Sequence, residues 1–128
     1  MPLYESATEL YGVMDQVIEQ LKENERFMSR IKRAKMSIGW KVSDLGAEYT
    51  TTIMEGELSG AQGGAADATI AVTMTAEVFD KLMSGKMSGE SAYMSGALRL
   101  RGNEWTAESA AMYLYYFAPA YKQVRGIA

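Results

Sequence analysis

The chain has 128 residues and a formal net charge of −3, and it contains neither cysteine nor histidine. Without these residues there are no disulfides, no thiolate nucleophile and no imidazole base or metal ligand. The negative charge disfavours nucleic acid as a partner. The sequence shows no secretory signal and no run apolar enough to span a membrane. We therefore expect a single domain over residues 1–128 in the cytoplasm.

The first thirty residues predict helices. Ser6-Ala7-Thr8-Glu9 has the spacing of a capping box, in which each polar side chain bonds the other residue's backbone amide. The apolar residues that follow recur with helical periodicity on one face. They are Leu10, Met14, Val17, Ile18 and Leu21. Asn24 ends or re-caps this helix, and residues 27–31 predict another turn or two.

The apolar period then changes from helical to alternating. Residues 36–42 alternate apolar and polar side chains, which predicts a half-buried strand. Asp44-Leu45-Gly46 is a turn, and residues 48–55 complete a hairpin. Residues 57–58 are expected as a short third strand, and the small, glycine-rich stretch 59–66 as a loop.

The second half alternates strands with helices. Strands are expected at 68–74 and 98–101, with helices at 76–84 and 88–94 between them, separated by glycines. The final helix is predicted from Trp105 to Ala118, ended by Pro119 and followed by a ragged tail. It carries no charge from Ala110 onward, so we expect it to be covered on more than one side.

Short motifs follow one another in a fixed order between residues 68 and 103. They are Ala68-Thr69-Ile70, Phe79, Leu82-Met83, Gly85-Lys86-Met87, Ser91-Ala92-Tyr93-Met94-Ser95-Gly96 and Leu98-Arg99-Leu100-Arg101-Gly102-Asn103. In this order and spacing they resemble the sterol carrier protein 2 family. The leading helix and the hairpin around Trp40 also come in the family's order, so the resemblance covers nearly the whole chain.

The resemblance implies an α+β fold, a five-stranded, largely antiparallel sheet covered on one face by helices and enclosing a hydrophobic tunnel. It also implies non-catalytic binding or transfer of a sterol, fatty acid, fatty acyl-CoA or phospholipid. Two positions depart from the family pattern. Ser95 stands where many members have a polar amide, and Ala97 stands where some have lysine.

Methionines and aromatics are the candidate ligand contacts. Methionine is flexible and polarizable, which suits a surface that repacks around different ligands, although it equally fills gaps in a core. The same alternative of core packing holds for the aromatics. The predicted ligand-binding residues are Trp40, Phe79, Met83, Met87, Tyr93, Met94, Leu98, Leu100, Trp105, Met112 and Tyr116.

The sequence also permits interpretations other than a lipid carrier. The apolar stretch Tyr113–Phe117 could be a dimer face of an interaction or oligomerisation domain with a filled core, so a homodimer is a possible assembly. A basic run at 30–35 is either a solvated face or a transient contact with a membrane surface or a CoA phosphate. Glu55 and Glu57 flank a turn and predict no acid–base pair. No enzyme activity, cofactor or metal site is predicted.

Overall fold

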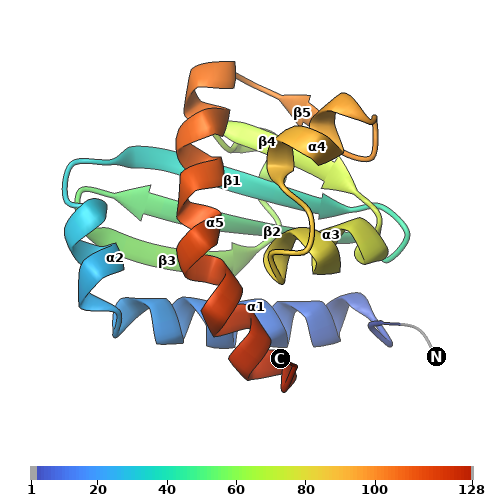
Figure 1. Cartoon of the computed structure of the whole chain (residues 1–128), viewed down its shortest axis with the longest axis horizontal. Helices are drawn as coiled ribbons and strands as arrows, with labels where there is room; N and C mark the ends of the chain where they lie inside the picture. The colour runs from blue at the N-terminus through green and yellow to red at the C-terminus, as the bar shows by residue number, and fades with distance from the viewer. Residues whose placement is uncertain (1–2, 128) are drawn as a thin grey trace.

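The computed structural model describes residues 3–127 and contains one five-stranded sheet with the strand order β3-β2-β1-β4-β5 (Figure 1). Three of the four neighbouring pairs are antiparallel and one, β1 with β4, is parallel. The expected five-stranded, largely antiparallel α+β fold is thus confirmed. The strands are β1 (Lys35–Val42), β2 (Ala47–Met54), β3 (Glu57–Gln62), β4 (Ile70–Met74) and β5 (Arg99–Arg101).

The α-helices cover one face of this sheet, with α5 crossing it and α1 along its β3 side (Figure 1). Side chains cap most helix starts, as predicted from Ser6, Asn24, Thr75 and Ser88. The helices are α1 (Ala7–Lys22), α2 (Glu25–Arg30), α3 (Ala76–Met83), α4 (Gly89–Met94) and α5 (Glu104–Arg125), with a single 3-10 turn, η1 (Ala65–Asp67).

Strand alternation decides which face the helices cover. In β1 the side chains of Ile38, Trp40 and Val42 are buried, whereas Lys35 is exposed on the opposite face. On that opposite face η1 packs against Gly39, where an added Cβ would lie 2.7 Å from the Ala65 backbone. The apolar and polar residues that alternate in the sequence of this strand therefore point in turn to the helix-covered face and to the more open face.

Strand β3 is longer than the sequence predicts and continues to Gln62. Its glycine is needed for packing rather than for a loop. An added Cβ at Gly60 would fall on the Tyr49 hydroxyl and 2.7 Å from the ring carbon that carries it. The Tyr49 hydroxyl donates to Asp15 on α1 at 2.7 Å, so the ring crosses directly beneath β3. A small residue on this edge strand makes room for the contact that ties the sheet to α1.

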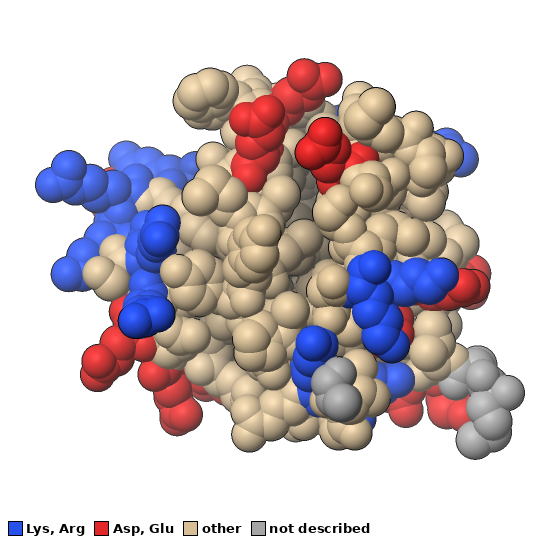
Figure 2. All heavy atoms as spheres, in the orientation of Figure 1, with Lys and Arg blue, Asp and Glu red and all other residues tan. Residues whose placement is uncertain are grey.

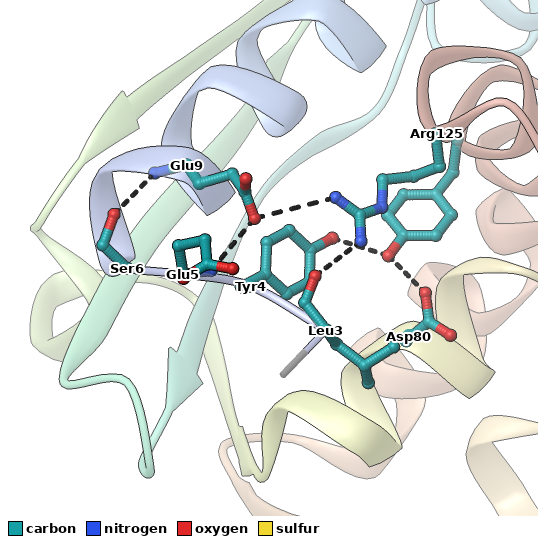
Figure 3. A network of polar contacts seen from close by, with 8 residues as sticks. Leu3, Tyr4, Glu5, Ser6, Glu9, Asp80 and Arg125 are labelled. Atoms are coloured by element: carbon teal, nitrogen blue, oxygen red, sulfur yellow. Dashed lines mark hydrogen bonds and ion pairs between the residues drawn. The ribbon is translucent and has the colours of Figure 1, made fainter. Parts of the chain in front are cut away.

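Helix α5 is also longer than predicted, because a polar network holds its last turns (Figure 3). The Tyr121 hydroxyl donates to Asp80 on α3 at 2.6 Å and lies 2.6 Å from the Tyr4 hydroxyl. Arg125 lies over the Tyr4 ring at 4.3 Å and donates to the Leu3 carbonyl. These contacts join residues 3–4 and the last turns of α5 to α3, so the expected ragged tail is wrong for the described residues.

Pro119 lies inside α5 and does not end it. Proline removes one backbone donor, and the helix continues because buried side chains beyond it hold the next turn. Ala120 and Tyr121 are both buried, and burial together with the hydrogen bond to Asp80 raises the pKa of Tyr121 above its usual value. The phenol therefore remains a protonated donor to the carboxylate.

We expect Tyr121→Phe to lower the free energy of unfolding by about 2 kcal/mol, because Asp80 loses its buried hydrogen-bond donor. Urea denaturation at neutral pH measures this loss. Tyr115→Phe is the matched control, since Tyr115 is 82% exposed, and it should change stability by less than about 0.5 kcal/mol. Equal stabilities for the two variants would contradict the role given to this network.

Candidate functional site

An apolar hollow of about 640 Å³ lies between the sheet and helices α4 and α5. This volume is within the usual range for small-molecule sites, roughly 300–1,000 Å³. Figure 2 shows the surface hollowed beside α5 on the helical side of the molecule. The residues around it are Ile38, Trp40, Ile70, Val72, Leu82, Gly89, Glu90, Tyr93, Met94, Leu98, Leu100, Glu104, Ala107, Glu108, Ala110, Ala111 and Leu114.

The sheet supplies the floor through residues in register. Ile38 pairs with Ile70, and Trp40 pairs with Val72, across the parallel β1–β4 ladder. Val72 pairs in turn with Leu100 on β5. All these side chains point to the helix-covered face, so three neighbouring strands form one continuous apolar surface.

Trp40 is held in place at the boundary between this floor and the closed core. Its indole N–H donates to the buried Thr51 hydroxyl at 3.2 Å, which leaves the indole without an unpaired polar atom. Its ring meets Phe79 edge-on at 5.8 Å and lies 6.5 Å from Phe117. Both phenylalanines are fully buried, so the indole has packed rings on one side and the hollow on the other.

The wall opposite the sheet consists mainly of small side chains on α5. Ala107, Ala111 and Leu114 recur at intervals of four and three residues, which places them on one helical face. Alanines here leave space that larger side chains would fill. Tyr93 and Met94 of α4 complete the wall and remain 47% and 78% exposed, so part of the hollow opens to the surface.

Three carboxylates stand at the edge of the apolar walls. They are Glu90 on α4 and Glu104 and Glu108 on α5, and all three are exposed. Figure 2 shows acidic side chains over the start of α5 and over α4, at the upper end of the hollowed region. Among residues 3–127, no lysine or arginine lines the hollow.

The structure places five of the predicted ligand-binding residues on the lining of this hollow. They are Trp40, Tyr93, Met94, Leu98 and Leu100. Their contact with a ligand remains a prediction. The geometry does bring them together from β1, α4, β5 and the segment between α4 and β5, which is the arrangement that a shared ligand would require.

The other six predicted residues lie elsewhere. Phe79 and Met83 are fully buried in the core, and the half-buried Met87 packs against the same core. Trp105 and Met112 are 78% and 59% exposed on α5, outside the hollow. Tyr116 packs on Phe27 at 5.4 Å and lines a second, more polar depression beside α2.

Sequence reasoning missed two groups of lining residues. The floor residues Ile38, Ile70 and Val72 follow from strand alternation once the register of β1 with β4 is known, and the sequence did not supply that register. The α5 face of Ala107, Ala111 and Leu114 carries a readable helical spacing. This spacing marks the face in the sequence, although alanines are less conspicuous there than methionines and aromatics.

The second depression, beside α2, has a mixed composition. It is lined by Glu25, Arg26, Ser29, Arg30 and Tyr116. Figure 2 shows basic side chains gathered over this end of the molecule. Because acidic, basic and hydroxyl groups share it, its chemistry differs from that of the apolar hollow.

Residues 3–127 lack two other kinds of feature. Within that range no group of three or more acidic side chains is arranged so that it could hold a metal ion. None of the described helices is both long and apolar enough to cross a membrane.

Comparison with protein families identifies the fold. The model of the SCP-2 sterol transfer family matches residues 14–113. The chain belongs to the SCP-2 sterol transfer family. The resemblance read from the ordered motifs is thereby confirmed. No curated protein sequence matches this chain.

Solved structures of this family have the same fold at low sequence identity. The sterol carrier protein domain 2 of Helicoverpa armigera is 19% identical with a TM-score of 0.70, over 93% of this chain and 94% of that one. Apo sterol carrier protein 2 of Yarrowia lipolytica is 20% identical with a TM-score of 0.62, over 90% and 95% of the two chains.

A larger enzyme contains a similar domain. A stereoselective inverting sec-alkylsulfatase from a Pseudomonas species is 20% identical with a TM-score of 0.58. The match covers 70% of this chain but only 13% of that enzyme. The likeness therefore concerns the fold of one part of the enzyme.

The two tryptophans test the placement of the hollow. With Trp105→Phe, Trp40 is the remaining indole, and we expect a bromine-bearing alkane to quench it because heavy-atom quenching needs near contact. With Trp40→Phe, only the exposed Trp105 remains, and the same compound should quench it much less. Steady-state fluorescence titration measures both. Stronger quenching of Trp105 would place apolar binding outside the hollow.

Proposed function

We propose that this chain binds and carries a lipid-like ligand in the hollow between the sheet and helices α4 and α5, without catalysing a reaction. The observation that supports the proposal is an apolar hollow of about 640 Å³ in a member of the SCP-2 sterol transfer family. In this reading the hollow is the ligand-binding part of the tunnel that the family resemblance implies.

The energetics need no charged contact. Each buried methylene contributes roughly 0.8 kcal/mol, so burying about ten gives on the order of 8 kcal/mol before the entropy of association is subtracted. That free energy corresponds to a dissociation constant around micromolar. The lining meets this requirement because most of it is aliphatic or aromatic.

The same energetics imply broad chain-length selectivity. One methylene more or less in an apolar pocket changes binding by only about 1–3 kcal/mol. Met94, which is exposed and can change rotamer, adds further tolerance at the rim. We therefore expect a carrier for a class of molecules rather than for one compound.

An alternative function is association through the outer face of α5. Trp105, Met112 and Tyr115 are 78%, 59% and 82% exposed there. Such a face is a common mark of interaction sites. Sedimentation velocity separates this alternative: a dimer that Tyr115→Glu dissociates would support it, and a concentration-independent monomer would exclude it.

Native mass spectrometry of the purified protein, together with displacement of the neutral dye Nile red by dodecanol, tests the carrier proposal. A bound lipid mass or saturable displacement supports it. Protein that carries no lipid and never takes up the dye contradicts it.

We expect Ala111→Trp to abolish Nile red uptake while the midpoint of thermal unfolding changes by only a few degrees. Ala111 is exposed and lines the hollow, so an indole there fills the hollow without entering the closed core. Met112→Trp is the control, because the next residue on α5 faces outward and is not part of the lining. Equal dye binding by the two variants would show that the dye binds elsewhere.

A further inference from the structure

The charged side chains that line the hollow in the described part of the chain are negative. Within residues 3–127, the charged residues that line the hollow are Glu90, Glu104 and Glu108, and all three are acidic. Acidic side chains cover this end of the molecule while basic ones gather over α2 (Figure 2). A ligand that fills the apolar walls would therefore place its polar end among carboxylates.

These carboxylates have no basic partner in the described part of the chain. None of the ion pairs among residues 3–127 includes Glu90, Glu104 or Glu108. The arginines nearest in sequence are on β5, where Leu100 faces the hollow, so strand alternation turns Arg99 and Arg101 to the other face. Arg101 donates there to the carbonyls of Ala65 and Ala68.

Helix stability explains two of the three positions. Glu90 and Glu104 lie in the first turns of α4 and α5, where a carboxylate complements the helix dipole. Glu108 lies one turn further and four residues from Glu104. A like-charged pair at that spacing destabilises a helix, so local stability does not account for Glu108.

We propose that the hollow selects amphiphiles whose polar end is cationic or neutral and donates hydrogen bonds, such as an ammonium or a hydroxyl, and discriminates against carboxylates, phosphates and CoA esters. This inference rests on the proposed carrier function. Carboxylates accept hydrogen bonds from hydroxyl and ammonium groups. Their negative charge also attracts the ammonium group. An anion instead meets three like charges, each of which repels it modestly because all three are exposed.

Three probes with the same twelve-carbon chain isolate the polar end: dodecylamine, dodecanol and dodecanoate. The ability of each probe to displace Nile red from the wild-type protein is measured at neutral pH and low salt. We expect dodecylamine to bind at least about tenfold more tightly than dodecanoate, with dodecanol between them, because exposed charge pairs each contribute modestly and three act together. Added salt should reduce the spread.

The variant Glu90→Gln, Glu104→Gln, Glu108→Gln should bring the three affinities within about threefold of one another. The control Glu19→Gln, Glu23→Gln, Glu57→Gln removes the same net charge from exposed positions away from the hollow, and it should keep the wild-type order. The comparison separates the local field from net charge.

Each outcome has a distinct meaning. If dodecanol does not bind the wild-type protein, the carrier function fails. If dodecanol binds but dodecanoate binds as tightly as dodecylamine, the carrier function survives and the charge selectivity is overturned. If both triple variants lose the order equally, net charge rather than the rim of the hollow sets the preference, which also overturns the inference.

Discussion

The position of Trp40 is the constraint on which both the core and the hollow depend. Its indole N–H is satisfied by Thr51, so the largest side chain on the central strand is buried without a lost hydrogen bond. Phe79 and Phe117 pack against it from α3 and α5. The closed core ends at this ring, and the small side chains of α5 beyond it leave the hollow open.

Most of the fold could be predicted from the sequence because its signals are local. The alternation of residues 36–42, the hairpin that follows and the caps at Ser6, Thr75 and Ser88 each act within a few residues. The two elements that the sequence predicted too short depend on contacts between residues far apart in the chain. Strand β3 continues through Gly60, because the Tyr49 ring occupies the space that a side chain at this position would need. Helix α5 continues past Pro119, because the Tyr121 hydroxyl donates a hydrogen bond to Asp80.

The candidate site was less predictable than the fold for the same reason. Methionine and aromatic content predicts adaptable apolar surface but not whether that surface faces a core or a hollow. Met83 is buried in the core and Met94 lines the hollow, although both belong to the segment 68–103 that carries the ordered motifs. Only the register of β1 with β4, formed by residues some thirty positions apart, decides which side chains share the floor.

Methyl-resolved NMR of the protein with bound dodecanol tests the central claim most directly. With labelled methionine and leucine methyl groups, we expect intermolecular NOEs from the ligand chain to Met94, Leu98 and Leu100. The fully buried Met83 supplies an internal reference that should show none. NOEs confined to Met112 on the outer face of α5, or none at saturating ligand, would contradict the assignment of the hollow as the binding site.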